Sequence, residues 1–166
     1  VDARLRVHPS SINCSALFLF ALIFDGHVYT VYPVLAGGGR LYAYSKTHTL
    51  ENINTIIIEE NINDIQCSPS QLSVISSKET IQSVCTGGES LPTSLITEWI
   101  SHIERFLNVY GPTEAACVVT AATCGREKTY STSIGAPYNN VRAYIVEPAD
   151  IATLQPPGVP GELIVA

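Results

Sequence analysis

The sequence predicts an α/β fold in which a parallel sheet is followed by a β-rich region. Between residues 40 and 110, short apolar runs alternate with segments whose apolar residues recur at helical spacing. That alternation is typical of parallel strands joined by helices. After Cys117 no helical period survives, and the apolar runs are separated by turns containing Gly and Pro. We place the parallel-sheet layer at about residues 16–120 and the β-rich region at about 121–166.

The individual elements follow from local patterns. The predicted strands are, in chain order, 40–44, 62–67, 80–85, 107–110, 118–122, 141–146 and 162–165. The first predicted helix is capped by Thr49 and carries apolar residues at helical spacing, which are Leu50, Ile53, Ile56 and Ile57. A second covers 71–75 after Ser68-Pro69-Ser70. A third begins at Pro92 and carries one apolar stripe, formed by Leu95, Trp99, Ile103 and Phe106.

Composition excludes several classes of protein. The 166 residues are 46% hydrophobic and 14% charged, with a net charge of −6. Apolar residues are too plentiful for a disordered chain, and basic residues are too few for a nucleic-acid-binding face. The apolar run 16–24 is shorter than the ~20 residues that span a bilayer, so we expect a buried strand or helix there and no membrane partner.

Two further counts concern the origin of the chain. The five cysteines form no C-x-x-C pair, which indicates small buried side chains and a cytoplasmic protein rather than a disulfide framework. The sequence contains no Met, so we expect that the chain was processed or is a piece of a longer protein.

Two loops are candidates for a ligand site. Thr86-Gly87-Gly88-Glu89 and Gly111-Pro112-Thr113-Glu114 each follow a short strand and combine glycine with a hydroxyl and a carboxylate. Ligands of open α/β sheets bind beyond the carboxyl ends of the strands, and this pair of groups suits a phosphate held with Mg²⁺. The second loop is equally a good turn before a helix. Gly37-Gly38-Gly39 lacks the Gly-Lys-Ser/Thr ending of a phosphate loop and is predicted to be a plain turn.

Asp25 is a third candidate. It follows the apolar run directly, so its carboxylate is expected at a buried position where it needs a cationic partner or several hydrogen-bond donors. Helix capping and binding of a ligand amine both remain open.

The segment Asn108-Val109-Tyr110-Gly111-Pro112-Thr113-Glu114 resembles the Asn-x-Tyr-Gly-Pro-Thr-Glu signature of the adenylation domains of nonribosomal peptide synthetases, in the adenylate-forming superfamily. Other segments resemble that family in the same order. These are Phe24-Asp25-Gly26-His27-Val28-Tyr29, Ala36-Gly37-Gly38 with Leu41, Thr86-Gly87-Gly88-Glu89-Ser90-Leu91, Ile134-Gly135-Ala136-Pro137 with Asn140, and Gly158 with Gly161-Glu162-Leu163. The likeness runs from about Phe24 to the end of the chain.

The resemblance implies an activity and a fold. An amino acid and ATP would give an aminoacyl-adenylate and pyrophosphate, with Mg²⁺, before transfer to the phosphopantetheine thiol of a peptidyl carrier domain in the same or a neighbouring polypeptide. The fold would be the central part of the family's large N-terminal domain, which ends in the start of a barrel-like β-rich subdomain.

The resemblance also implies residue roles. Asp25 would pair with the substrate α-ammonium, Tyr110 would stack on adenine, and Thr113 would contact phosphate. Glu114 would hold Mg²⁺. The remaining nucleotide-binding positions would be Gly87, Gly88, Glu89, Asn108 and Gly111. The rest of the amino-acid pocket would be Gly26, Tyr29, Gln66, Cys85, Gly87, Val109, Cys117 and Val118. This lining suits a medium or large side chain with one hydrogen-bonding group.

Several family segments have no counterpart here. Nothing resembles the Lys-containing phosphate loop, the Thr-Gly-Asp segment or the C-terminal domain with its lysine. We therefore expect a fragment that is inactive alone. One alternative is an aryl- or fatty-acid–CoA ligase, which would leave Asp25 without an amine partner. The other is a truncated, non-catalytic remnant, which the intact Thr113 and Glu114 oppose.

Overall fold

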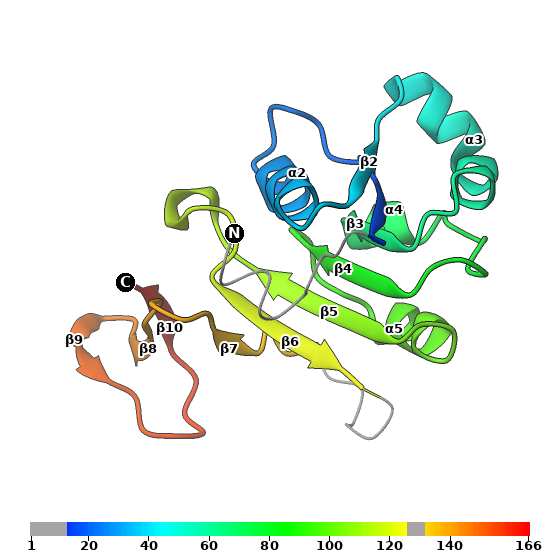
Figure 1. The fold of residues 1–166 in the computed structure, drawn as a ribbon. Coiled ribbons are helices and arrows are strands. Elements are labelled where there is room, and N and C mark those ends of the chain that lie inside the picture. Colours follow the sequence, from blue (N-terminus) through cyan, green and yellow to red (C-terminus); the bar gives the residue numbers. More distant parts are fainter. Residues whose placement is uncertain (1–12, 126–131) are drawn as a thin grey trace.

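The computed structural model describes residues 13–125 and 132–166 and has two sheets (Figure 1). The larger has seven strands in the order β2-β1-β3-β4-β5-β6-β7. Their bounds are β1 Ser15–Leu17, β2 Arg40–Tyr42, β3 Asp64–Cys67, β4 Ser83–Gly87, β5 Arg105–Tyr110, β6 Thr120–Cys124 and β7 Ala136–Pro137. The pairs from β2 to β5 are parallel, whereas β6 and β7 are antiparallel to their neighbours. The predicted α/β class with a parallel sheet is confirmed.

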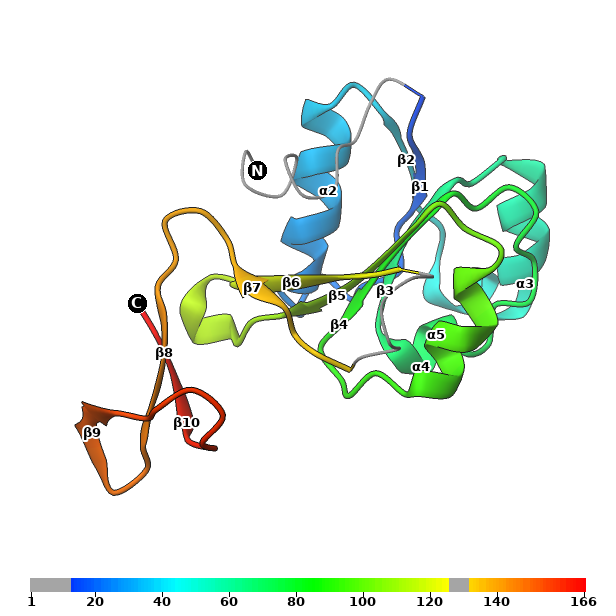
Figure 2. The ribbon, with the colours of Figure 1, turned by 90° about the horizontal axis from the view of Figure 1, so that it is seen from below.

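Helices cover both faces of this sheet. Figure 2 shows α2 (Gly26–Ala36) on one face, and α3 (Lys46–Glu59), α4 (Pro69–Leu72) and α5 (Thr93–Ile100) on the other. The second face holds the larger apolar core, in which Trp99 and Phe106 are completely buried. The face under α2 holds a smaller cluster that includes Tyr29, Cys85 and Leu107. That smaller cluster surrounds the candidate site.

Three local predictions are corrected. Ser45, and not Thr49, caps α3: its backbone is extended and its Oγ accepts a hydrogen bond from the His48 amide at 3.3 Å. Leu50 is 62% exposed and therefore does not belong to the buried stripe of that helix. Only the start of the run 16–24 forms a buried strand, since Ile23 is 97% exposed.

The predicted third helix is shorter than its apolar stripe. Helix α5 ends at Ile100, so Ile103 lies in a turn and Phe106 in β5. Both side chains nevertheless pack in the same core as Trp99. A core shared by a helix, a turn and a strand can therefore imitate a helical period in the sequence.

The second sheet has three antiparallel strands in the order β10-β8-β9, which are β8 Ala143–Glu147, β9 Asp150–Leu154 and β10 Glu162–Val165. Since β6 and β7 extend the first sheet, the second one begins at Ala143; the division near residue 120 stays a prediction. Residues 37–39 form the predicted plain turn, in which Gly38 has a φ of 76°. In the described part of the chain, no helix is long and apolar enough to cross a membrane.

Candidate substrate pocket and nucleotide groove

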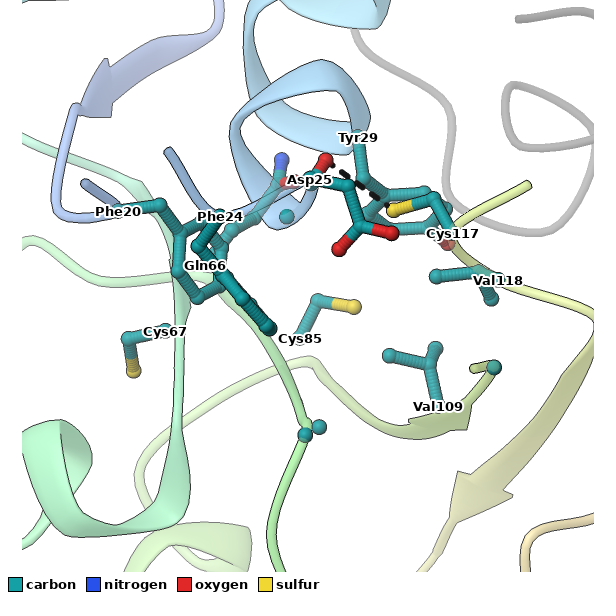
Figure 3. A pocket seen from close by; sticks show the side chains of 14 residues that line it. Phe20, Phe24, Asp25, Tyr29, Gln66, Cys67, Cys85, Val109, Cys117 and Val118 are labelled. Carbon is teal, nitrogen blue, oxygen red and sulfur yellow. Dashed lines mark hydrogen bonds between the residues drawn. The ribbon is translucent and has the colours of Figure 1, made fainter. Parts of the chain in front are cut away.

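The carboxyl ends of β3, β4 and β5 form the floor of a pocket beneath the N-terminal end of α2 (Figure 3). Parallel pairing sets Gln66 opposite Cys85, and Gly87 opposite Val109. Because side chains alternate between the faces of a sheet, Gln66, Cys85 and Val109 present their side chains to one face, and Gly87 adds no side chain there. The register thus brings residues far apart in the sequence to one place.

The pocket encloses about 420 Å³ of space, part of which is open to solvent. Its lining includes all nine residues expected around the amino acid. They are Asp25, Gly26, Tyr29, Gln66, Cys85, Gly87, Val109, Cys117 and Val118. Gly88 and Gly111, which were expected to bind nucleotide, line it as well. The structure therefore brings the predicted positions together, while their individual roles stay predictions.

Sequence reasoning missed three lining residues, Phe20, Phe24 and Cys67. The two phenylalanine rings lie 5.6 Å apart, centroid to centroid, and form an apolar wall. Phe20 and Phe24 are four residues apart, and Phe24 directly precedes Asp25, which could have indicated that both rings lie beside the pocket. The two residues belong to the run 16–24, however, which was expected to form a buried strand or helix. Cys67 ends β3 and carried no signal of its own.

Asp25 stands at the N-cap position of α2 without capping it. Its backbone is helical, with φ −64° and ψ −15°, and its side chain makes no capping hydrogen bond. Its Oδ2 atom is buried and has no hydrogen-bond partner among the described residues. Figure 3 shows the carboxylate directed into the space near Cys85 and Val118. A buried carboxylate oxygen without a donor is costly, so this position favours a cationic ligand over helix capping.

The segment after η1 (Thr113–Ala115) closes one side of the pocket. Ala116 and Cys117 both have positive φ values, 63° and 82°, which are strained for residues other than glycine. The chain folds back so closely that a Cβ atom on Gly111 would lie 2.1 Å from the Cys117 carbonyl oxygen. This close approach places Cys117 and Val118 in the pocket wall.

The Cys117 side chain contacts the main chain of Asp25. Its Sγ donates a hydrogen bond to the Asp25 carbonyl oxygen at 3.3 Å. Burial, followed by the negative charge of Asp25, raises the pKa of the Cys117 thiol to about 11, although a backbone hydrogen bond at Tyr29 acts in the opposite direction. Cys117 is therefore a neutral wall residue at pH 7 and not a nucleophile.

A second cavity, of about 950 Å³, adjoins the pocket along Gly88, Val109 and Gly111. It is lined also by Glu89, Asn108, Tyr110 and by residues 132 and 134. The Tyr110 side chain is 38% exposed, which leaves ring surface for a planar ligand to stack on. We call this cavity the nucleotide groove, after the role that the resemblance implies for its residues.

Two predicted groove residues have partners within the protein. The Asn108 Nδ2 donates to the Ser133 carbonyl oxygen at 2.9 Å and so holds that segment beside β5. The Glu89 Oε2 accepts hydrogen bonds from the Ser70 hydroxyl at 2.5 Å and the Ser70 amide at 3.1 Å. The Ser70 hydroxyl is the main cause that lowers the pKa of Glu89. Through these hydrogen bonds Asn108 and Glu89 hold neighbouring segments of the chain in place around the groove.

Thr113 and Glu114 lie on the exposed η1 turn and line neither cavity. Across residues 13–125 and 132–166, no cluster of three or more metal-ligating side chains occurs. A single carboxylate fits Mg²⁺, which keeps several waters and binds proteins through one or two carboxylates together with substrate phosphates.

Fold and site together define an α/β protein with a pocket at the carboxyl ends of its parallel strands. The pocket contains one carboxylate, that of Asp25, and adjoins a larger groove. The sequence pattern of the AMP-binding enzyme family matches residues 6–166, and the chain belongs to that family. The resemblance to the adenylation domains of nonribosomal peptide synthetases is confirmed by the relatives as well.

Three matches indicate the range of similarity. Tyrocidine synthase 3 of Brevibacillus parabrevis is 34% identical over 86% of this chain and 2% of that protein. The NRPS-like tryptophan epimerase fscC of Fusarium equiseti is 32% identical over 98% of this chain and 11% of that protein. A solved four-domain nonribosomal peptide synthetase, bound to AMP and glycine, has a TM-score of 0.85 and 23% identity over 98% of this chain and 13% of that one. The chain thus spans a small part of each, and the last match shows the fold alone.

Proposed function

We propose that this chain supplies the amino-acid pocket and the nucleotide groove of a domain that activates an amino acid with ATP. One amino-acid carboxylate oxygen would attack the α-phosphorus of ATP, which forms an aminoacyl-adenylate and releases pyrophosphate. The aminoacyl group would then pass to the phosphopantetheine thiol of a carrier domain. Membership of the AMP-binding family and synthetase relatives support this proposal.

The single observation that carries the amino-acid assignment is the buried, unpartnered Oδ2 of Asp25. An α-ammonium group would supply both the missing donor and the missing countercharge. A fatty or aryl acid has no amine, so binding it would bury the Asp25 carboxylate without compensation. The geometry thus favours an amino acid over the substrate of a CoA ligase.

The other roles follow from the placement of the residues. Tyr110 would stack on the adenine in the groove, where Gly88 and Gly111 allow the ligand to approach the backbone. Thr113 would contact phosphate, and Glu114 would help hold Mg²⁺, which neutralises phosphate charge when bound. The groove adjoins the pocket, as attack of the carboxylate on the α-phosphate requires.

The test is amino-acid-dependent pyrophosphate exchange by the full-length protein that contains this chain. Each amino acid would be offered separately, with tryptophan included because one relative is named a tryptophan epimerase. Parallel reactions would contain fatty or aryl acids and coenzyme A. Exchange with an amino acid supports the proposal, whereas acyl-CoA formation without any amino-acid response would identify a CoA ligase. No turnover in either assay would favour a non-catalytic remnant.

A further inference from the structure

Tyr138 lies outside the pocket but is hydrogen-bonded to a residue that lines it. Its hydroxyl shares a hydrogen bond with the hydroxyl of Tyr29, and the two residues are 109 positions apart in the sequence. Both side chains are buried, and they pack in the same apolar cluster. Tyr29 lines the pocket, whereas Tyr138 does not. The bond therefore connects the pocket wall to a residue behind it.

The backbone fixes the position of Tyr138. Its amide donates to the Val119 carbonyl oxygen at 2.9 Å, and its own carbonyl oxygen accepts from the Val141 amide at 3.0 Å. Asn140 belongs to the same turn and has a φ of 69°. Directly before Tyr138, β7 pairs with β6. Tyr138 therefore lies on a segment that is hydrogen-bonded to the first sheet on both sides of the residue.

The N-terminal turn of α2 connects Asp25 with Tyr29. The two residues are four positions apart, which places them on the same face of a helix. Figure 3 shows both side chains on the side of the pocket where Cys117 lies. The Asp25 side chain makes no capping hydrogen bond to this turn. Two other hydrogen bonds join the turn to segments that flank β6, one from the Cys117 Sγ to the Asp25 carbonyl oxygen and one between Tyr29 and Tyr138.

We propose that Tyr138 is a positioning residue, which acts through Tyr29 to hold Asp25 where it meets the substrate α-ammonium group. This inference rests on the proposed function. Tyr138 contacts neither the amino acid nor the nucleotide. Its hydroxyl fixes the Tyr29 side chain, and thereby the helical turn that carries the Asp25 carboxylate. Such support matters because a binding group has to be held within about 0.5 Å of its productive position.

The expected effect follows from the value of one buried hydrogen bond. A bond between two neutral groups shifts an equilibrium about twofold to tenfold. Without it, the turn occupies the binding position for a smaller fraction of the time, and the apparent affinity for the amino acid falls by that fraction. In Tyr138→Phe we therefore expect the KM for the amino acid to rise about twofold to tenfold, while kcat and the KM for ATP change little.

The test is amino-acid-dependent pyrophosphate exchange by the full-length protein, measured with the amino acid that the wild type activates best. Tyr138→Phe keeps the aromatic ring and removes only the hydroxyl. Tyr32→Phe is the matched control, because it makes the same change on α2 at a side chain that is 56% exposed, and it should alter neither KM. Thermal melts are recorded in parallel. A lower melting temperature of Tyr138→Phe with an unchanged KM for the amino acid would show a purely structural role and overturn the inference.

A double-mutant cycle tests whether Tyr138 acts through Asp25. In the Asp25→Asn background the charge to be positioned is absent, so Tyr138→Phe should have little further effect on the KM for the amino acid. An equal rise in both backgrounds overturns the positioning role while the proposed function stands. No exchange by the wild type with any amino acid overturns both proposals. If Tyr138→Phe fails to fold, Tyr29→Phe removes the same hydrogen bond, and the same cycle with Asp25→Asn decides.

Discussion

Replacing Asp25 by Asn separates ligand binding from stability, because the two are expected to respond in opposite ways. The substitution keeps the shape of the side chain and removes its charge. In the ligand-free structure the Asp25 Oδ2 has no donor among the described residues, so the carboxylate contributes little that Asn would lose. We expect the free energy of unfolding to stay the same or to rise, since a partly buried charge disappears.

The effect on the reaction can be estimated from the same geometry. Opposite unit charges about 3 Å apart attract by about 5 kcal/mol at an effective dielectric of about 20, before the cost of removing both from water. The net value of a hydrogen bond to a charged group is about 1.5–3 kcal/mol. At about 1.4 kcal/mol for each tenfold change, Asp25→Asn should lower kcat/KM for the amino acid about tenfold to hundredfold.

The assay is pyrophosphate exchange by the full-length protein at varied amino-acid and ATP concentrations, with thermal unfolding measured in parallel. The apparent KM for ATP should change little. Glu51→Gln on the exposed side of α3 is the charge-matched control and should alter neither quantity. Undiminished amino-acid-dependent exchange would refute the ammonium assignment. A loss of several kcal/mol of stability would instead show that Asp25 is a structural residue.

Three further predictions concern the walls of the two cavities. Gly87→Ala should lower the free energy of unfolding by about 1–3 kcal/mol, because its Cβ would lie 2.4 Å from a carbonyl oxygen of β5; Gly125→Ala, which meets nothing within 4 Å, should be neutral in the same thermal melt. Ser70→Ala should destabilise the protein by less than about 1 kcal/mol at pH 7, since the contact is exposed. The hydrogen bond from Ser70 holds the pKa of Glu89 below its value in the unfolded chain. The stability that this bond contributes is therefore present above the unfolded pKa and is lost as the pH falls through the folded pKa. Thermal melts of the wild type and the variant should accordingly differ at pH 7 and converge at pH 3. Alkylation of Cys117 by iodoacetamide should quicken with pH up to about 11, and a plateau near pH 9 in peptide mass spectra would contradict its burial.

The pocket lining was predictable because the family's motifs occur in the same order along this chain. The positions of Gln66 and Cys85 depend on the assumption that no insertion lies between those motifs, and the structure pairs these two residues directly. The α/β class was predictable from the alternating apolar patterns. Neither inference required knowledge of any side-chain contact.

The helix cap of α3 and the contact between Ser70 and Glu89 could not be predicted from the sequence. Ser45 and Thr49 are one helical turn apart and both suit a helix cap, so only the extended backbone at Ser45 decides between them. The Thr49 hydroxyl instead donates back to the Ser45 carbonyl oxygen at 3.1 Å. The bond between Ser70 and Glu89 joins residues from different elements, and no local pattern announces it.

Strand β5 explains how one segment serves two cavities. Leu107 and Val109 pack with Tyr29 on the face under α2, whereas Phe106 packs in the core on the opposite face. Tyr110, which follows Val109, lines the nucleotide groove but not the pocket. A shift of the register by one residue would exchange these faces and turn Tyr110 toward the pocket. The fixed pairing of β4 with β5 is therefore as important to the site as any single side chain, because it sets which ligand each residue can meet.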